Sequence, residues 1–402
     1  MKLELAGQKI LLTQAHLVRY MGSEIVTLEL AEFFVSEGAE VVVVTHAIGS
    51  PVADDIVAID GVTVFSLDDP ALDDNLAERL PDIAWIHHSM LPKRVLENAA
   101  DIVFLFHHMS SILAAEFTLD AALEVELATA VLFESPKSLD VHRATGVYDD
   151  VESERLQVMG NPAAQGFAVD REQSAARRVL VVSNHIPEEL VDAVAGLRER
   201  FEVVLVGAQT ELGAAPQRVT PDLITSADAV ISIGKTVQYS MVSGTPVYVY
   251  DHFGGPGWLT VDNLEETSYE NFSGRGFNRK TASTIIQEVS SGIEAAWGDA
   301  QDLREVALAR YTLAGRIGRL LSYAAEHPRA VSAIDTQRIM GHELMQQAFG
   351  VYVREWVRMQ RDRDLLEGEL TELRGRNDNI ERDYVRVTTK PLVKVALKLS
   401  KN

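Results

Sequence analysis

Two pairs of adjacent histidines follow short apolar runs in the first third of the chain. His87-His88 follows a run ending at Ile86, and His107-His108 follows a run ending at Phe106. A neutral imidazole can accept a proton or hydrogen-bond a hydroxyl group, so these side chains are candidates for acid–base chemistry. Some of the four would be ordinary core histidines. A metal site is not expected, because no Asp or Glu shares their loops at ligand spacing.

A second candidate site lies between residues 226 and 247, where a predicted strand passes into a short helix. The strand ends at Ser232, Gly234 permits a tight turn, and the helix opens at Thr236 after Lys235. The free N–H groups and positive dipole end of a helix N-terminus favour phosphate. The alternative is an ordinary capped helix with a solvated lysine. The glycine spacing of a Walker loop is absent.

Two glycine-rich turns follow this helix in the sequence. One, at 251–258, contains Gly254 and Gly255, and the other, at 271–277, contains Arg275. Glycines let the backbone approach a ligand closely. Three such loops at one strand edge predict a pocket for a nucleotide diphosphate.

The loop at 15–24 follows the first predicted strand, Lys9 to Thr13. It carries His16 and the run Gly22-Ser23-Glu24, just before an apolar helix. Such a helix start can hold an anion or a sugar hydroxyl. The alternative is that Ser23 caps the helix and Gly22 makes the turn.

The elements that must position these groups alternate between strand and helix. Apolar, β-branched runs of four to six residues are separated by segments with helical periodicity, which predicts an α/β fold with a largely parallel sheet. The pattern pauses at 160–174 and restarts at Arg178. We therefore predict two Rossmann-like domains facing a central cleft, at 1–160 and 175–325, and a helical extension at 326–402.

The amino-acid composition excludes several classes of function. The chain has 402 residues, a formal net charge of −22 and no cysteine. The acidity argues against nucleic-acid binding, and the lack of cysteine excludes thiolate catalysis and zinc fingers. We expect a cytoplasmic protein, because a chain without cysteine suits a reducing compartment. The sequence also shows neither a secretory signal nor a membrane-spanning run.

The helical extension carries a seven-residue repeat. Between Trp356 and Val387, eight of the ten seam positions are apolar or aromatic, which predicts a coiled coil and self-association over 356–387. Asn377 in the seam is a residue type that fixes register. The alternative is one amphipathic helix packed back on the domains.

The last residues, 390–402, combine lysines at helical spacing with apolar side chains. A basic amphipathic segment in an acidic chain suggests docking on an anionic membrane surface. Docking on the protein's own acidic surface is the alternative.

These motifs together resemble glycosyltransferases with the GT-B fold. The stretch from Asp228 to Val247 is similar to their donor-domain signature, Gly22-Ser23-Glu24 to an N-terminal segment, and 158–162 to the hinge strand. The resemblance implies that the second domain binds a nucleotide sugar, UDP-sugars among them, and that the first binds a carbohydrate, lipid-linked or cell-envelope acceptor. It implies that His107 lies near the transferred sugar, and no bound cofactor or metal is expected.

The sequence also departs from that pattern. Tyr239 stands where the retaining branch has its second glutamate, and no Glu occurs between Asp228 and Asp251. The loop from Ser183 to Pro187, with His185, is closer to that of UDP-N-acetylglucosamine 2-epimerases, which share the fold. Two rivals to a glycosyltransferase therefore stay open: a nucleotide-sugar epimerase, and a catalytically inactive partner subunit.

Overall fold

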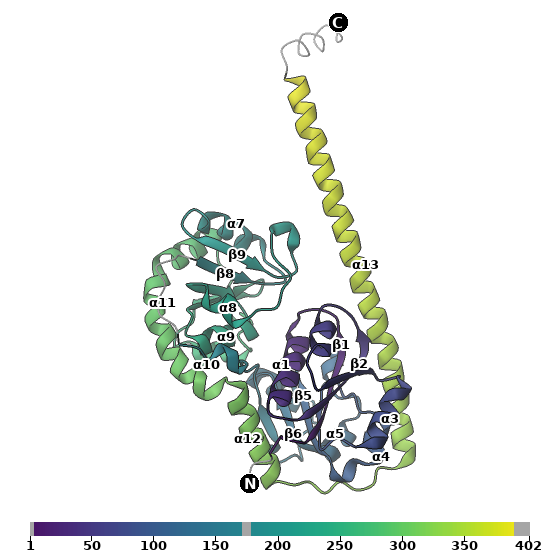
Figure 1. The fold of residues 1–402 in the computed structure, drawn as a ribbon. Coiled ribbons are helices and arrows are strands. Elements are labelled where there is room, and N and C mark those ends of the chain that lie inside the picture. The colour runs from purple at the N-terminus through teal and green to yellow at the C-terminus, as the bar shows by residue number, and fades with distance from the viewer. Residues whose placement is uncertain (1–3, 171–177, 390–402) are drawn as a thin grey trace. The chain divides into compact units, whose positions relative to one another are not determined.

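The computed structural model describes residues 4–170 and 178–389. The first domain, which Figure 1 shows together with the rest of the chain, is built on a seven-stranded sheet. All of its strands are parallel, in the order β3-β2-β1-β4-β5-β6-β7. The strands are β1 (Lys9–Leu17), β2 (Glu40–Ile48), β3 (Val62–Ser66), β4 (Ile83–Ile86), β5 (Val103–His108), β6 (Ala128–Phe133) and β7 (Leu156–Val158).

Helices connect these strands. They are α1 (Gly22–Ser36), α2 (Val52–Val57), α3 (Pro70–Glu78), α4 (Lys93–Glu97), α5 (Ala121–Leu127) and α6 (Pro136–Arg143), with short 3₁₀ turns η1 (Ala99–Asp101), η2 (Ala114–Glu116), η3 (Ser153–Arg155) and η4 (Gln165–Phe167). Several begin at the expected capping side chains: Asp69, Asp120 and Ser135 each accept a backbone N–H from the first turn.

The second domain has a five-stranded sheet in the order β12-β11-β10-β8-β9, parallel except for β12. Its strands are β8 (Arg178–Val182), β9 (Glu202–Val206), β10 (Ala229–Ser232), β11 (Val247–Asp251) and β12 (Gly254–Trp258). Its helices are α7 (Glu188–Leu197), η5 (Thr210–Leu212), α8 (Pro221–Thr225), α9 (Lys235–Ser243), α10 (Leu264–Tyr269) and α11 (Ala282–Arg310).

Both faces of this second sheet are buried. Along β10, Val230 belongs to one apolar cluster, and its neighbours Ala229 and Ile231 belong to another. Successive side chains of a strand point to opposite faces, so each face has its own core. This confirms the predicted α/β class, because a strand buried on both sides needs the near-continuous apolar run found in the sequence.

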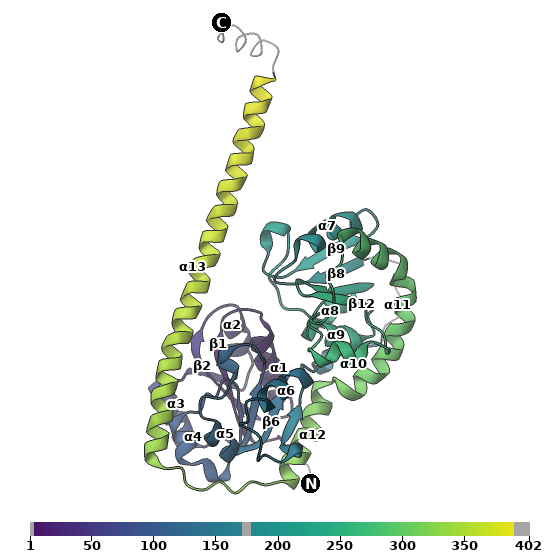
Figure 2. The ribbon, with the colours of Figure 1, turned by 180° about the vertical axis from the view of Figure 1, so that it is seen from behind.

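The boundary predicted at residue 325 differs from the packing. Helix α12 (Leu313–Glu326) contributes Leu313, Ile317 and Leu320 to the apolar cluster that contains Ile10 and other residues of the first sheet. Figures 1 and 2 show this helix beside β6. The chain therefore returns to the first domain after α11. Periodicity predicted the helix but could not show which core covers its apolar face.

Two segments cross between the domains side by side. The Ala163 N–H donates to the Tyr311 carbonyl at 2.7 Å, and the Leu313 N–H donates to the Ala163 carbonyl at 2.8 Å. The first crossing falls in the predicted hinge, of which residues 171–174 lie outside the described part.

The last described element is the long helix α13 (Thr336–Thr388). Contacts divide the chain into a unit at 1–351 and a unit at 352–402, so α13 begins in the first and continues into the second. The predicted basic segment at 390–402 lies outside the described residues. Among the described helices, none is long and apolar enough to span a membrane.

Candidate active site

Groups on β1, β4 and β5 form a chain of hydrogen bonds, in which Thr13 lies in the middle of β1 and His87 and His107 lie at the carboxyl ends of β4 and β5. His87 Nδ1 is 2.8 Å from the backbone carbonyl of Thr13, and His87 Nε2 is 3.2 Å from His107 Nδ1. Because a carbonyl oxygen only accepts, His87 Nδ1 must carry a proton. Burial lowers the pKa of His87 to about 3, so the ring is neutral. Its Nε2 therefore accepts the Nδ1–H of His107.

This arrangement leaves His107 with a free acceptor. Burial, together with the neighbouring His87, holds the pKa of His107 well below its usual range, so the ring is neutral and its Nε2 carries no proton. Within residues 4–170 and 178–389, this buried nitrogen has no hydrogen-bond partner. Leaving a buried polar atom unpaired costs about 1–3 kcal/mol, which a ligand hydroxyl would recover.

The position of this nitrogen in the fold favours a ligand. The strand order reverses between β1 and β4, and ligands of open parallel sheets bind outside the carboxyl ends of the strands at such a point. Thr13 and His87 flank the reversal, and His107 is on the next strand. The positive charge of Lys235, from the second domain, also contributes to lowering the pKa of His107.

The other two histidines of the predicted pairs have internal partners. His88 Nδ1 accepts the Ala15 N–H at 3.3 Å, and His88 Nε2 is 3.1 Å from Glu116. His108 Nδ1 donates to the Glu116 carbonyl at 2.5 Å, and its Nε2 lies 2.9 Å from Glu124. With both ring nitrogens engaged, neither side chain offers a free atom to a substrate, so His107 is the stronger catalytic candidate.

His108 and Glu124 form a buried ion pair. Burial lowers the pKa of His108, but Glu124 and Glu116 together raise it by more, so the net shift is upward. Burial likewise raises the pKa of Glu124, but His108 and the hydrogen bonds from Tyr148 and Thr118 together lower it by more. The Tyr148 hydroxyl donates to the same Glu124 oxygen at 2.5 Å. The pair therefore ties β5 to α5 as a structural element beside His107.

Glu134 is a candidate that the sequence analysis missed. It directly follows β6, so it lies at the same sheet edge as the histidines, and only 6% of it is exposed. Burial raises the pKa of its carboxyl to about 7. Its Oε2 has no hydrogen-bond partner among the described residues. The sequence could have predicted Glu134, because it directly follows the apolar run that ends at Phe133, just as the histidines follow their own apolar runs.

The predicted N-terminal loop is shorter than expected. β1 continues to Leu17, which places His16 on the strand, 3.0 Å from the Glu24 carboxylate. Gly22 starts α1 without a side-chain cap, so the capping alternative for Ser23 does not apply. Instead, Ser23 accepts the Gln14 amide at 2.9 Å and donates to Glu24 at 3.1 Å. These groups form a polar cluster at the end of β1.

The predicted phosphate site is at the N-terminus of α9. Gly234 precedes the helix with φ 63°, and its N–H donates to the Phe272 carbonyl at 3.0 Å. Among the described residues, the N–H groups of Lys235 and Thr236 have no acceptor. Ser232, at the end of β10, donates its hydroxyl to the Val182 carbonyl at 2.8 Å and is buried. The helix start therefore keeps two donors for an anion, while Ser232 is used internally.

The side chains of Lys235 and Tyr239 are engaged by the first domain. Lys235 Nζ lies 2.8 Å from Glu29 of α1 and donates to the Pro162 carbonyl at 2.9 Å. The Tyr239 hydroxyl also donates to Glu29, and its ring stacks on Phe167 with centroids 3.8 Å apart. Both side chains are therefore part of the domain interface, and the ammonium group is already paired with a carboxylate.

The first predicted glycine-rich turn is mostly a strand. Gly254 and Gly255 begin β12, which pairs antiparallel with β11. A Cβ on Gly255 would lie 2.0 Å from the Val249 carbonyl oxygen, and one on Gly254 would lie 2.7 Å from that of Asn278. Close backbone packing therefore accounts for both glycines without a ligand.

Arg275 remains a candidate ligand group. Its guanidinium lies 3.6 Å from the centre of the Phe253 ring. Burial lowers the pKa of Arg275, and the charge of Glu270 acts in the opposite direction. The hydrogen bond from Gly234 to Phe272 places this loop beside the start of α9. His185, on the exposed β8–α7 loop, has its ring 6.0 Å from that of His252. Cationic and aromatic groups therefore border this end of the second sheet.

Backbone strain concentrates in two loops of this region. Among the described residues, the non-glycine positions with positive φ are His88, Ser89, Asn271 and Phe272. One pair follows β4 in the first domain, and the other contacts Gly234 in the second. Each such residue costs about 1–3 kcal/mol, and strain of this kind is typical of functional sites.

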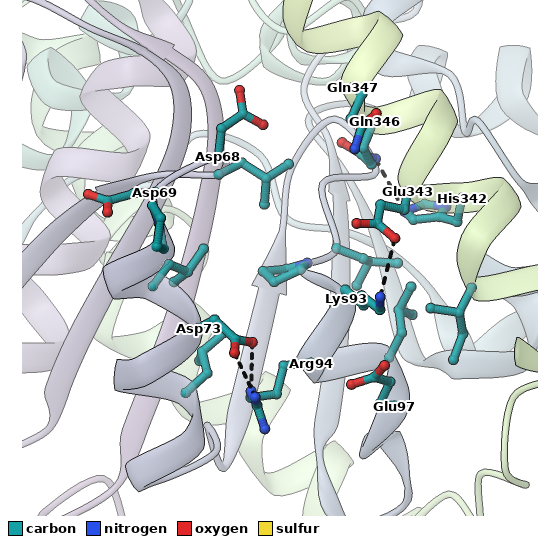
Figure 3. Close-up of a pocket in the computed structure, with 18 residues that line it drawn as sticks. Asp68, Asp69, Asp73, Lys93, Arg94, Glu97, His342, Glu343, Gln346 and Gln347 are labelled. Carbon is teal, nitrogen blue, oxygen red and sulfur yellow. Dashed lines mark hydrogen bonds and ion pairs between the residues drawn. The ribbon is translucent and has the colours of Figure 1, made fainter.

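A pocket of about 610 Å³ lies elsewhere in the first domain (Figure 3). Residues of α3, α4 and α13 line it, and Arg94 pairs with Asp73 at 2.6 Å across it. Near its rim, the Gln346 amide donates to the Ser89 carbonyl, so α13 supports the strained loop that carries His88. No predicted site residue lines this pocket. Groups of three or more metal-ligating side chains are also absent from the described part of the chain.

Solved structures resemble the chain in fold. A glycosyltransferase from Rickettsia africae ESF-5 matches with a TM-score of 0.51 at 13% identity, covering 79% of this chain and 98% of that one. This chain has the GT-B fold. Anabaena Alr3699/HepE in complex with UDP matches with a TM-score of 0.49 at 14% identity, covering 79% and 100% of the two chains.

A third similar structure is a putative UDP-N-acetylglucosamine 2-epimerase from Listeria monocytogenes, with a TM-score of 0.48 at 13% identity, covering 82% of this chain and 99% of that one. No protein-family model and no curated protein matches the sequence. The GT-B fold therefore confirms the predicted pair of Rossmann-like domains, and the activity has to be argued from the site.

Proposed function

We propose that the protein is a glycosyltransferase that moves a sugar from a nucleotide diphosphate to a carbohydrate or lipid-linked acceptor. The observation that carries the proposal is the unpartnered, unprotonated Nε2 of His107 at the strand-order reversal of the first sheet. This atom can accept a hydrogen bond from a sugar hydroxyl, or take its proton during transfer. The glycosyltransferase that shares the fold supports the same reaction class.

His107 is held in one tautomer by the atoms behind it. The Thr13 carbonyl orients His87, and His87 orients His107, so the ring needs no change of tautomer when a ligand displaces the groups that bury its Nε2. Prior orientation of this kind lowers the cost of reaching the reactive geometry. Glu134, at the end of the neighbouring strand β6, has a pKa of about 7 and is the best candidate for a second acid–base group.

The second domain would hold the donor. In this proposal, the two free N–H groups at the start of α9 and the guanidinium of Arg275 bind the diphosphate and stabilise the charge that develops on the leaving group. No metal is needed for that role. Lys235, which precedes this helix start in the sequence and would be expected to bind the diphosphate with it, joins the domains through Glu29 unless a ligand displaces that carboxylate.

Calorimetric titration with UDP-, GDP- and dTDP-sugars tests donor binding. Arg275→Ala should weaken binding by roughly 10-fold to 100-fold, as expected for loss of a hydrogen bond between charged groups. His107→Ala should keep donor binding and reduce transfer by about 10²-fold to 10⁴-fold. His327→Ala, an exposed histidine at the end of α12, is the matched control and should change neither. If no sugar nucleotide binds, the proposal is wrong.

A catalytically inactive partner subunit is the second candidate. The ion pair between Lys235 and Glu29 favours an inactive subunit, because the ammonium group beside the predicted diphosphate site is then already bound to a carboxylate. Such a protein would bind nucleotide sugars weakly and neither transfer nor hydrolyse them. Sugar release that is detectable in the wild type and lost in His107→Ala would exclude it.

A further inference from the structure

The part of α13 beyond residue 352 carries an uncovered apolar stripe. Seven of the eight apolar or aromatic seam side chains are between 46% and 68% exposed, namely Met359, Leu366, Leu370, Leu373, Ile380, Tyr384 and Val387, and the eighth, Trp356, is partly buried. An isolated helix is marginally stable in water, and contiguous exposed apolar surface marks an interaction site. The stripe therefore needs a partner.

The period of the stripe identifies the kind of partner. The two seam positions recur every seven residues, which is 3.5 residues per turn after supercoiling, so the stripe suits another helix rather than a flat surface. Gly368 and Gly375 both fall on the side opposite the seam, where a Cβ added to either glycine would meet no atom within 4 Å. They weaken the helix without leaving gaps in the seam.

The charges beside the seam are complementary to a second copy of the same helix. In a parallel pair, Glu369 of one chain lies opposite Arg374 of the other, and Arg376 lies opposite Glu381. Symmetry makes each attraction occur twice. Two like-charged contacts oppose them: Asp362 lies opposite Glu367, and the seam residue Arg363 faces its own copy. Each Arg363 also lies 3.6 Å from Glu367 of its own chain, which offsets part of both repulsions.

The polar seam residue favours the parallel, in-register arrangement. In a parallel pair Asn377 faces its own copy, and two amides can hydrogen-bond each other. In an antiparallel pair, each Asn377 would face apolar seam residues such as Leu373 or Ile380, which would leave a buried amide unpaired. A shift of one heptad in the parallel pair creates the same mismatch.

From these observations we propose that residues 356–388 form a parallel, in-register, two-stranded coiled coil with a second copy of this chain. The seam supplies the buried apolar surface, Asn377 sets the register, and the Glu369–Arg374 and Arg376–Glu381 pairs set the direction. The segment carries seven arginines and eight acidic residues, so two copies meet without the repulsion expected for the chain as a whole, whose net charge is −22.

Light scattering of the full chain during size-exclusion chromatography measures the number of copies. The wild type should have the mass of two chains. Leu366→Asp with Leu373→Asp should give a monomer in which the melting transition of residues 1–351 is unchanged. Leu365→Asp is the matched control, because Leu365 is 68% exposed and lies on the same turn as Leu366 but outside the seam. It should leave the dimer intact.

Charge reversal tests the side pairs. Glu369→Arg should weaken dimerisation by roughly 2-fold to 10-fold, and adding Arg374→Glu should restore it, because the swapped pair is again attractive. Restoration is a result that a general effect on folding would not give. Failure of the second substitution to restore the dimer would overturn the assigned pairing.

The direction can be read from a disulfide, since the chain has no cysteine of its own. Val387→Cys lies in the seam near the end of the helix, so mild oxidation should link two parallel chains there. Val385→Cys, exposed and outside the seam, should not link. A monomeric wild type, a mass of three or more chains, or a dimer in which Val387→Cys fails to link would each overturn the proposal.

Discussion

Replacing the Glu134 carboxyl with an amide should stabilise the protein at alkaline pH. Burial raises the pKa of Glu134 from 4.5 to about 7. A shift of 2.5 pKa units is worth about 3 kcal/mol at 1.36 kcal/mol per unit. The folded state therefore disfavours the charged carboxylate by that amount, and Glu134→Gln removes the charge while nearly keeping the shape.

The sign of the pH dependence follows from the raised pKa. Below about pH 4.5 the carboxyl is protonated in both the folded and unfolded states, so its ionisation affects neither. Between about pH 4.5 and pH 7 the unfolded state ionises and the folded state does not, so the wild type loses stability as the pH rises. Above pH 7 the full difference of about 3 kcal/mol is present. Glu134→Gln should not show this loss.

Thermal melting between pH 4 and pH 8.5 is the assay. If residues 1–351 unfold together, an unfolding entropy of about 2.1 cal/mol/K per residue converts 3 kcal/mol into roughly 4 °C. The gap between Glu134→Gln and wild type should widen by that amount from pH 4 to pH 8. Glu78→Gln, at an exposed carboxylate on α3, is the control and should show no widening. A gap that is constant with pH would refute the buried, protonated carboxyl.

Further predictions concern activity, a buried pair, a tight backbone contact and the domain interface. If Glu134 takes part in transfer, the pH profile of kcat/KM should have a limb near pH 7 that disappears in Glu134→Gln, whereas a flat profile would remove it from the mechanism. Glu124→Gln should destabilise the protein by about 3 kcal/mol at neutral pH, measured by thermal melting. In the wild type, the stabilisation from the His108–Glu124 ion pair should be lost when the pH rises through the raised pKa of His108, and also when the pH falls through the lowered pKa of Glu124. Gly207→Ala should cost more than about 3 kcal/mol, because its Cβ would lie 1.8 Å from the Ser183 carbonyl oxygen, while Gly298→Ala, with open space around it, should not destabilise. Glu29→Gln should free Lys235 and tighten sugar-nucleotide binding by roughly 10-fold; unchanged affinity with a lower melting temperature would assign Lys235 to the interface alone.

The fold was predictable because its signals are local. Apolar runs bounded by polar residues marked the strands, and the restart at Arg178 marked the second sheet. The strand-end rule also brought His87 and His107 together, since the carboxyl ends of adjacent parallel strands meet at one edge. Their ring-to-ring hydrogen bond is a direct consequence of that register.

The partners of these side chains were not predictable, because they depend on contacts between distant segments. Glu29 lies in the middle of α1, where all residues from Val26 to Ala31 are buried, and its type alone does not predict that α9 supplies its partners. Glu116 similarly gains its partner His88 only through the path of the loop after β5. Gly254 and Gly255 were interpreted as a ligand loop, since sequence does not show whether a glycine makes room for a ligand or for a neighbouring strand.

The paired passage of the chain at Ala163 and Thr312 restricts how the two sheets can move. A single connection would act as a swivel with freedom about several axes, but two adjacent strands of backbone, bonded to each other, resist twisting and permit bending about one line. The two domains would then open and close by rotation about a single hinge axis. Each closure would return the Lys235 ammonium group to Glu29.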